Sequence, residues 1–505
     1  MATSYAVGPA ETPLVGETIG ECFERIVKTF PDNEALISRS QKLRFTYREL
    51  KKEVDRFARG LLHLGLGRGD RVGIWSPNNF EWIVAQFATP KIGTILVNIN
   101  PAYRVAELEY ALKQSGINTL ILAPAFKKSN YIAMINDLMP EVKRSESSKL
   151  RISGYPELRH IIVLGDERHS GMYTWKDITE MASETTFEKL EEKEKEQQFD
   201  DPINIQYTSG TTGFPKGATL SHHNILNNAY FSGEAMKFSS TDRLCIPIPF
   251  YHCFGMVLSN LLCVTHGSTM ILPSDSFSPE TVLETVEQEK CTALHGVPTM
   301  FISELEHSDF SRRDLTSLRT GIMAGAPCPI EVMKNVVNKM GCREITIAYG
   351  MTETSPVSLQ TRVDDPLELR VTTVGRVHPH VEAKIIDPET KKIVERGTPG
   401  ELLVRGYLVM LGYWNNPSST SESIDDARWM HTGDLAVMND EGYVNIVGRS
   451  KDMISRAGEK VFPREVEEFL YTHPKISDAQ LIGVPSSYYG EEVMAWIKLK
   501  EGEDA

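Results

Sequence analysis

The chain has 505 residues and a formal net charge of −14, so nucleic acid and anionic membranes are excluded as main partners of its surface. One hydrophobic core seldom supports a chain of this length, and we therefore expect two or more domains. The seven cysteines show no Cys-x-x-Cys spacing, which favours a reducing compartment without a structural zinc site.

The N-terminal region predicts amphipathic helices and shows no targeting segment. Residues 1–21 contain neither an apolar signal core nor an Arg-rich stretch. Thr18 to Glu21 and Thr46 to Glu49 each fit a capping box, and hydrophobic residues at helical spacing follow both. We therefore expect a helix to begin at each box.

Strand-like and helix-like segments alternate over the next part of the chain. The expected strands are 72–75, 95–97 and 117–122, and the expected helices are 80–89 and 104–113. The alternation returns from Ile203 to about Val447, with strands expected at 203–206, 244–248, 269–272, 345–348 and 402–404. This pattern predicts an α/β fold in which two lobes of mainly parallel sheet are covered by helices.

Two segments between these elements have distinctive composition. Glu188 to Glu196 mixes five glutamates with three lysines, which predicts an exposed, solvated helix. The apolar region Met256 to Leu272 is interrupted by polar residues, so it predicts a buried helix, a turn and a strand in place of a membrane span.

A loop rich in glycine and hydroxyl groups follows the strand expected at 203–206. It consists of Tyr207, Thr208, Ser209, Gly210, Thr211, Thr212, Gly213, Phe214, Pro215, Lys216 and Gly217. Glycines let backbone N–H groups converge, hydroxyls add donors, and Lys216 adds a positive charge, which together suit a polyphosphate. Pro215 and Gly217 flank the lysine, which excludes a Walker A loop. A flexible surface loop is the alternative.

Three further clusters carry groups that suit a nucleotide. Tyr349 to Glu353 follows an expected strand, at the carboxyl end where open α/β sheets bind ligands. There Tyr349 could stack on a base, Thr352 could donate to a phosphate and Glu353 could hold Mg²⁺. Asp434, in a tight turn, suits ribose hydroxyls, and Arg449 lies beside Lys451. A strand-end turn and plain surface turns remain open as alternatives.

Two more stretches are weaker candidates. Gly321 to Pro329 has small residues that permit close approach of a ligand, although tight packing explains them equally. His252 lies in an aromatic stretch and could bond a carboxylate beside an acyl pocket, although a buried structural histidine is the commoner case. No Ser-His-Asp ordering, metal-ligand spacing or Gly-x-Ser-x-Gly elbow is present.

In this order, Tyr207 to Gly217, Tyr349 to Glu353, Thr432 to Leu435 and Gly448 to Asp452 resemble the adenylate-forming superfamily, which includes acyl-CoA synthetases, luciferases and adenylation domains. Three runs most resemble medium-chain fatty acyl-CoA ligases of the acyl-CoA synthetase family member 2 type. They are Thr208 to His222, Pro249 to Gly255 and Gly406 to Trp414.

The resemblance implies an enzyme that uses ATP, CoA and Mg²⁺. A fatty acid would first form acyl-AMP and pyrophosphate, and the thiol of CoA would then displace AMP. Thr208 to Lys216 would hold the β- and γ-phosphates, Thr352 the α-phosphate and Glu353 the Mg²⁺. Tyr349 would pack on adenine, Asp434 and Arg449 would bind ribose, His252 would lie beside the acyl carbonyl, and Gly325 and Ala326 would line the adenine and acyl group.

The resemblance also implies a large domain, residues 1–448, a hinge, residues 449–452 with Lys451 at its centre, and a C-terminal lid from 453 to 505. Lids of this superfamily normally continue further and end with a Gly-Lys motif that contacts the substrate carboxylate. We therefore expect this polypeptide to bind ATP, to adenylate poorly and to use preformed acyl-AMP.

Two other functions stay open from the sequence. A non-catalytic protein that binds ATP or acyl-adenylate would share these motifs, and so would a luciferase-like oxidase. The expected partners are small molecules only, and no oligomeric state is predicted. The resemblance implies a mitochondrial protein, but the N-terminus does not support this, so the cytosol and the peroxisome stay open.

Overall fold

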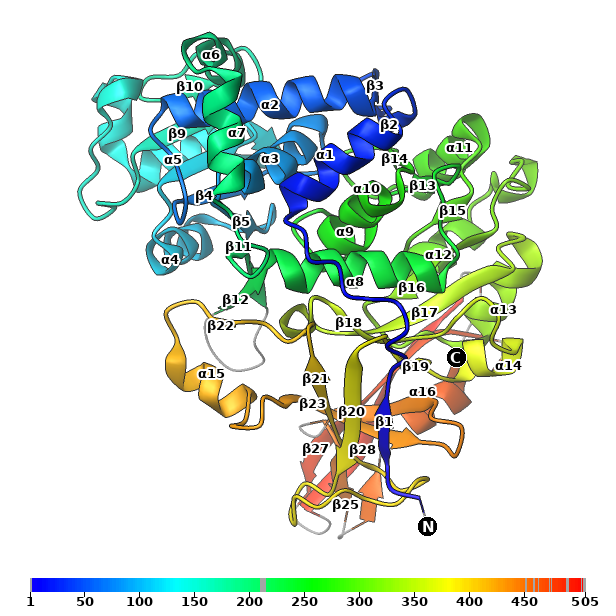
Figure 1. The fold of residues 1–505 in the computed structure, drawn as a ribbon. Helices are drawn as coiled ribbons and strands as arrows, with labels where there is room; N and C mark the ends of the chain where they lie inside the picture. Colours follow the sequence, from blue (N-terminus) through cyan, green and yellow to red (C-terminus); the bar gives the residue numbers. More distant parts are fainter. Residues whose placement is uncertain are drawn as a thin grey trace.

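The fold is seen in a computed structural model of the chain (Figure 1). The structure describes residues 2–208, 215–449, 452–456, 459–461, 463–471, 473, 475–486, 490–500 and 502. Ser209, Gly210, Thr211, Thr212, Gly213 and Lys451, which the sequence marks as candidates, lie outside these residues.

Two large sheets with covering helices form the upper part of the molecule in Figure 1. In spatial order, the first contains β10 (Tyr173–Thr174), β9 (His160–Val163), β6 (Thr119–Leu122), β4 (Arg71–Trp75), β5 (Ile95–Ile99), β11 (Pro202–Thr208), β12 (Lys216–Ser221) and β22 (Gly412–Tyr413). The second contains β19 (Arg376–Val377), β18 (Val357–Gln360), β17 (Glu344–Gly350), β16 (Thr320–Ala324), β15 (Ala293–Leu294), β13 (Arg243–Cys245), β14 (Thr269–Leu272), β2 (Glu34–Ser38) and β3 (Leu43–Thr46). Neighbouring strands from β10 to β11 and from β17 to β2 are parallel, as predicted.

The helices follow the strands closely in the chain. They are α1 (Ile19–Thr29), α2 (Tyr47–His63), α3 (Phe80–Lys91), α4 (Val105–Ser115), α5 (Tyr131–Leu138), α6 (Trp175–Met181), α7 (Phe187–Lys195), α8 (His222–Ala235), α9 (Cys253–Gly255), α10 (Leu262–His266), α11 (Pro279–Glu289), α12 (Pro298–Leu305), α13 (Ile330–Lys339), α14 (Leu367–Thr372), α15 (Pro417–Ser423) and α16 (Pro463–Tyr471). Both predicted capping boxes are confirmed. The side chains of Thr18 and Thr46 accept hydrogen bonds from the backbone N–H groups of Glu21 and Glu49, and the glutamate side chains accept from the backbone N–H groups of the threonines.

Short turns of other helix types connect some of these elements. They are η1 (Pro140–Arg144), η2 (Ser147–Lys149), η3 (Ala182–Glu184), the π-helix η4 (Met256–Leu261), η5 (Phe310–Arg312) and η6 (Thr352–Thr354). The apolar region Met256 to Leu272 is a buried helical segment followed by β14, as predicted. No helix in the described part of the chain has the length and hydrophobicity needed to cross a bilayer.

The two sheets do not divide the chain into an earlier and a later lobe, as the alternation suggested. Strands β2 and β3 come from the N-terminal region, yet β2 pairs with β14 of the second sheet. Strand β22 comes late in the chain and closes the first sheet beside β12. The sequence period identifies a strand but carries no information about its partner, which explains the error.

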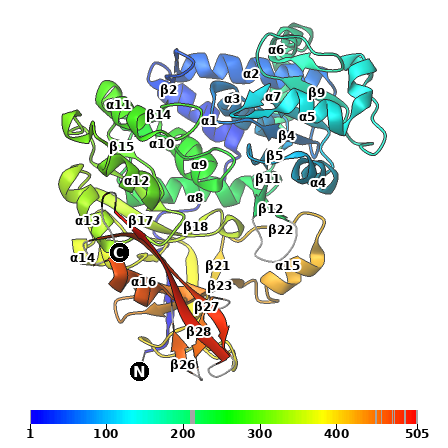
Figure 2. The ribbon, with the colours of Figure 1, turned by 180° about the vertical axis from the view of Figure 1, so that it is seen from behind.

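A third sheet lies below the first two in Figure 1 and is antiparallel. It contains β1 (Tyr5–Val7), β20 (Val381–Ile386), β21 (Gly400–Gly406), β23 (Met430–Met438) and β24 (Val444–Arg449). We predicted helices alternating with strands up to Val447, and this was wrong for most of residues 381–449, where α15 is the only helix among the described elements. Seen from behind in Figure 2, this sheet adjoins the end of the second sheet that carries β18 and β17.

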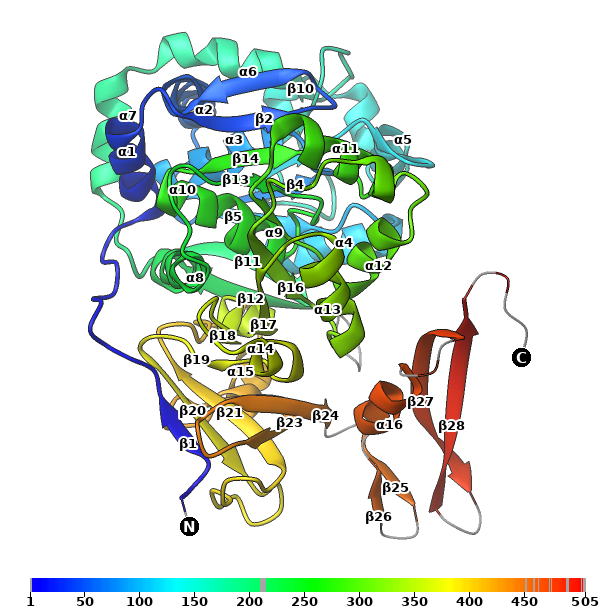
Figure 3. The ribbon, with the colours of Figure 1, turned by 90° about the vertical axis from the view of Figure 1, so that its right-hand side faces the viewer.

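The C-terminal elements form a fourth sheet of β26 (Glu459–Val461), β25 (Ile454–Arg456), β28 (Gly490–Leu499) and β27 (Ile476–Ser486). Figure 3 shows this sheet and α16 to one side of the molecule, beyond the end of β24. A small hairpin of β7 (Ala125–Phe126) and β8 (Ser129–Asn130) completes the list of strands.

Helix α7 corrects the expectation of a solvated charged face. Most of its glutamates are exposed, but the Glu194 side chain is 14% exposed and lies 3.6 Å from Lys91 Nζ. Lys91 is 1% exposed and also pairs with Asp55 at 2.8 Å and with Glu24. Burial, together with the carboxylates of Glu24 and Asp55, raises the Glu194 pKa to about 7. This ion cluster fixes α7 against α1, α2 and α3.

Candidate active site

The stems of the glycine-rich loop are held by strand pairing. Strands β11 and β12 form a hairpin in which Thr208 lies opposite Lys216, and the Thr208 hydroxyl donates to the Lys216 carbonyl at 3.4 Å. The Tyr207 hydroxyl donates to Gln114 Oε1 at 2.8 Å, and the Tyr110 hydroxyl donates to the Pro215 carbonyl at 2.9 Å. Helix α4, which carries Tyr110 and Gln114, therefore fixes both stems, so that Lys216 projects from a rigid base.

The segment after β17 places a carboxylate close to this lysine. Glu353, in η6, is 5% exposed, and its Oε1 accepts a 2.6 Å hydrogen bond from the Tyr413 hydroxyl. The Nζ of Lys216 lies 5.1 Å from the centroid of the Tyr413 ring, within the range of a cation–π interaction. One tyrosine thus links the lysine of the loop to the candidate metal ligand.

Thr352 and His252 approach the same place from different elements. Cys253 follows His252, and its thiol interacts with the Thr352 hydroxyl and with the charge of Glu353. His252 is the N-cap residue of α9. Part of its side chain reaches solvent, while the protein around the ring desolvates it and lowers its pKa. The imidazole of His252 is therefore neutral at pH 7, and the next residue, Cys253, contacts Thr352.

A second group of candidates surrounds Tyr349. Its hydroxyl donates to Asp434 Oδ2 at 2.5 Å, and Arg449 Nε lies 3.4 Å from Asp434 Oδ1. Antiparallel pairing of β23 and β24 puts Asp434 opposite Arg449. Burial raises the Asp434 pKa, although the bond from Tyr349 and the charge of Arg449 act in the opposite direction. These three groups form a polar cluster suited to vicinal hydroxyls.

The strip of small residues lies at the end of the strand beside Tyr349. Strands β16 and β17 are parallel with Ala324 opposite Ala348, so Gly325 and Ala326 continue from the same sheet edge as Tyr349. Both residues are exposed, and Gly325 has a φ of +85°, a left-handed conformation that favours glycine. The edge is therefore open to a flat ligand at this point.

The structure forms two clusters of candidates, Lys216 with Glu353 and Tyr349 with Asp434 and Arg449, and Tyr349 and Glu353 connect them at the carboxyl end of β17. Neither Tyr413 nor Cys253 was singled out by sequence reasoning as a site residue. The aromatic pair of Tyr413 and Trp414 after Gly412 was the available signal, but sequence spacing gave no indication that it approaches Glu353, 60 residues away. The described residues contain no group of three or more His, Cys, Asp or Glu side chains able to hold a metal.

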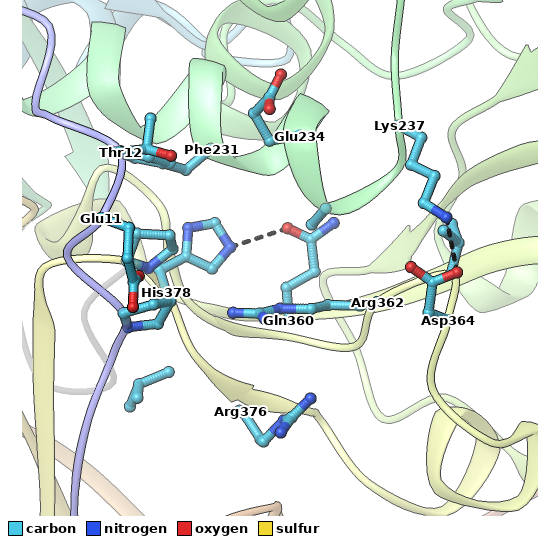
Figure 4. A pocket seen from close by; sticks show the side chains of 15 residues that line it. Glu11, Thr12, Phe231, Glu234, Lys237, Gln360, Arg362, Asp364, Arg376 and His378 are labelled. Atoms are coloured by element: carbon cyan, nitrogen blue, oxygen red, sulfur yellow. Dashed lines mark hydrogen bonds and ion pairs between the residues drawn. The ribbon is translucent and has the colours of Figure 1, made fainter.

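A separate pocket of about 200 Å³ lies between the N-terminal segment, the end of α8 and strands β18 and β19 (Figure 4). Its lining includes Glu11, Arg362 and Arg376, and His378 Nε2 lies 2.9 Å from Gln360 Oε1. None of the candidate site residues lines it. It is distinct from the site at the ends of β16 and β17.

Known proteins match this chain over nearly its whole length. The AMP-binding enzyme family matches residues 23–414. YngI of Bacillus subtilis, whose name proposes an acyl-CoA synthetase, is 50% identical over 97% of this chain and 89% of its own length. The mitochondrial medium-chain acyl-CoA ligase ACSF2 of Danio rerio is 44% identical over 100% of this chain and 83% of its own length.

Two solved structures with the same fold contain anthranoyl-AMP or ATP. The anthranilate CoA ligase AuaEII in complex with anthranoyl-AMP is 25% identical with a TM-score of 0.85, covering 98% of this chain and 89% of its own. ATP-bound MatB from Rhodopseudomonas palustris is 28% identical with a TM-score of 0.80, covering 96% and 90%. The family match over residues 23–414 and the 50% identity to YngI show that this chain belongs to the AMP-binding enzyme family.

Proposed function

We propose that the chain is an ATP-dependent fatty acid–CoA ligase that prefers medium-chain acids. The observation that carries this proposal is that two clusters, Lys216 with Tyr413 and Glu353, and Tyr349 with Asp434, meet at the carboxyl end of β17. The name of the ACSF2 relative supports the substrate class and the chain length. The same name supports a mitochondrial location.

In the first step an oxygen of the fatty acid carboxylate attacks the α-phosphorus of ATP, and the bond to the β-phosphate oxygen breaks to release pyrophosphate. Negative charge accumulates on the departing oxygens, so fixed positive groups stabilise the transition state. Lys216 supplies such a charge beside the loop stem. The Thr352 hydroxyl donates a hydrogen bond to the α-phosphate, and the N–H of neutral His252 donates a hydrogen bond to the acyl carboxylate.

In the second step the thiol of CoA loses its proton, and its sulfur attacks the acyl carbonyl carbon. The bond from that carbon to the AMP oxygen breaks, which gives the thioester and AMP. Tyr349 stacks on the adenine, and Asp434 and Arg449 bind the ribose, so that AMP stays oriented through both steps. Gly325 and Ala326 leave room for the adenine and the acyl group.

Glu353 fits a Mg²⁺ ion that arrives with ATP. It is a lone carboxylate, and Mg²⁺ in nucleotide sites takes one or two carboxylates together with phosphate oxygens and water. Its Oε1 is bonded to Tyr413, and no described residue bonds its Oε2. When bound, the ion neutralises phosphate charge. Glu353 would hold such an ion through its carboxylate, and the ion would add positive charge to that of Lys216.

The C-terminal elements act as a lid in this proposal. Residues 1–448 form the large domain, 449–452 the hinge around Lys451, and 453–505 belong to the lid. The two steps need different groups beside one carbonyl, and a rotating lid supplies them in turn. Exchange of Lys451 for proline would restrict the hinge and slow whichever step requires rotation.

The deciding experiment offers the protein ATP, Mg²⁺, CoA and a series of short-, medium- and long-chain fatty acids. AMP and acyl-CoA are then measured by mass spectrometry. We expect both products, with the highest kcat/KM for medium-chain acids. Bound nucleotide without turnover would select a non-catalytic binding protein, and light emission with a luciferin and oxygen would select a luciferase-like oxidase.

A further inference from the structure

Tyr413 contacts both charged groups on the phosphate side of the site. Its hydroxyl donates to Glu353 Oε1 at 2.6 Å, and its ring centroid lies 5.1 Å from Lys216 Nζ. Tyr413 is 9% exposed, so water competes weakly for either contact. A hydrogen bond to a carboxylate is stronger than one between neutral groups, particularly with little water nearby.

The backbone around Tyr413 is bonded to the elements that carry both partners. Strand β22 pairs with β12, with Tyr413 opposite Ala218, and the Trp414 N–H donates to the Gly217 carbonyl at 2.7 Å. On the other side, the Met410 N–H donates to the Glu353 carbonyl at 2.9 Å. Residues 410–414 therefore join the strand that begins at Lys216 to the main chain of Glu353.

We propose that Tyr413 is a positioning residue for the metal and phosphate groups of the adenylation step. Its hydroxyl occupies one oxygen of Glu353 and fixes the carboxylate, so that the other oxygen is directed to the divalent cation of the nucleotide. Its ring holds the Lys216 ammonium near that carboxylate before ATP binds. The site is thereby pre-organised, and less rotamer freedom is lost when the nucleotide arrives.

The chain contains a matched control with the same three kinds of group. The Tyr443 hydroxyl donates to Asp365 Oδ1 at 2.6 Å, and the Arg376 guanidinium lies 4.7 Å from the centroid of the Tyr443 ring. Tyr443 lies just before β24, whereas Arg449 ends that strand. Removal of the Tyr443 hydroxyl deletes an equivalent bond without affecting Glu353 or Lys216.

The experiment compares Tyr413→Phe with Tyr443→Phe. Affinity for Mn²⁺, used as a paramagnetic probe, is measured by electron paramagnetic resonance in the presence of a non-hydrolysable ATP analogue. We expect Tyr413→Phe to weaken Mn²⁺ binding roughly 10- to 150-fold, the cost of one hydrogen bond to a charged group, and Tyr443→Phe to leave it unchanged. Equal Mn²⁺ affinity in the two variants would overturn the proposal.

A double-mutant cycle tests whether the effect passes through Glu353. In a Glu353→Gln background, Tyr413→Phe should change Mn²⁺ affinity less than twofold, because the carboxylate that it positions is gone. An undiminished effect would show that Tyr413 acts elsewhere and would count against the assignment. If Tyr413→Phe does not fold, Tyr413→His, which keeps an aromatic ring but is too short to bond Glu353, takes its place and should weaken Mn²⁺ binding likewise.

Because this role presupposes the proposed function, the kinetics are measured separately. In pyrophosphate release, Tyr413→Phe should raise the Mg²⁺ concentration for half-maximal rate by a factor similar to that for Mn²⁺ binding and change the fatty acid KM little, as expected for a group that acts on the metal and not on the acid. Absence of turnover in the unsubstituted protein would refute the proposed function. The Mn²⁺ comparison would still decide the role of Tyr413.

Discussion

Two clusters of the molecule combine a tyrosine, a carboxylate and a cation, but they differ in how many oxygens of the carboxylate accept a hydrogen bond. Around Tyr443, both oxygens of Asp365 are used, because Oδ1 also accepts from Arg376 at 3.2 Å and Oδ2 accepts from a backbone N–H at 2.7 Å. Around Tyr413, Glu353 Oε2 has no donor and Lys216 has no carboxylate partner among the described residues.

The difference separates structural from functional use of the same groups. A buried carboxylate with both oxygens satisfied contributes to stability, and its replacement leaves its partners without bonds. A carboxylate with one oxygen free of described donors can bind a cation through that oxygen. Mutation should therefore change stability in the first cluster and catalysis in the second.

The largest effect is expected for the two carboxylates. Glu353→Gln should slow pyrophosphate release roughly 10²- to 10³-fold, as loss of one preorganised electrostatic group does, with little change in melting temperature. Asp365→Asn should leave kcat and KM near those of the unsubstituted protein and lower the free energy of unfolding by about 1–3 kcal/mol. Single-turnover kinetics and thermal unfolding of both variants measure these effects. A loss of stability in Glu353→Gln together with a loss of rate in Asp365→Asn would contradict the comparison.

The two cations, Lys216 and Arg376, should also differ in their effects on rate and stability, with a smaller difference in rate than between the carboxylates. Lys216→Met keeps the length of the side chain and removes its charge, and we expect pyrophosphate release to slow by roughly 10- to 100-fold. Arg376→Met should change that rate less than twofold and lower thermal stability, because Arg376 bonds Asp365 and covers Tyr443. Equal rates for the two variants would contradict the assignment of Lys216 to the phosphates.

A third comparison concerns the residues that bind the ribose of ATP and take no part in the chemical step. Asp434→Asn should raise the KM for ATP roughly tenfold with a smaller change in kcat, because ribose is bound equally in the ground and transition states. Tyr349→Phe removes the hydroxyl that donates to Asp434 at 2.5 Å, and it should shift the ATP KM in the same direction by less. An effect of Asp434→Asn confined to kcat would assign Asp434 to the chemical step.

The smallest effect should come from the ion cluster of α7, and it depends on pH. The raised Glu194 pKa means that ionisation in the folded state is unfavourable, so the stability present below the unfolded pKa of about 4.5 is lost as pH rises to about 7. Glu24, Lys51, Asp55 and Lys91 face this carboxyl group.

Glu194→Gln should therefore match the original protein at pH 5 and be more stable by about 1–2 kcal/mol at pH 8. Denaturant unfolding at the two pH values measures the difference. A control, Glu191→Gln on the exposed part of the same helix, should show no such pH dependence. A loss of stability in Glu194→Gln at pH 8 would show that the ionised form is net favourable beside Lys91.

The sequence predicts local features of the fold well because they depend on neighbouring residues. Both capping boxes, the apolar runs of the parallel strands and the turn after β17 are encoded within a few positions. The antiparallel sheet of residues 381–449 was missed, since its strands are interrupted by long loops without a clear period. Partners of strands such as β2 and β22 depend on long-range packing that no local pattern records.

The candidate site shows the same division. Tyr349 to Glu353 and the glycine-rich loop are recognisable because several functional groups are adjacent in the chain. Asp434 and Arg449 are weak signals singly, and they acquire meaning only where β23 pairs with β24. Tyr413 was not given a role, because a tyrosine in a glycine-flanked aromatic run resembles ordinary packing until Glu353 is seen 2.6 Å away.

Strand β1 has a consequence for the order in which the chain folds. Tyr5 pairs with Lys384, so the first strand to be synthesised waits for a partner almost 380 residues later. Until then, β1 has no strand to pair with, and unpaired strands promote association with other chains. The sheet that carries Asp434 is thus completed late, and the nucleotide site becomes competent only after the chain from β1 to β24 has been made.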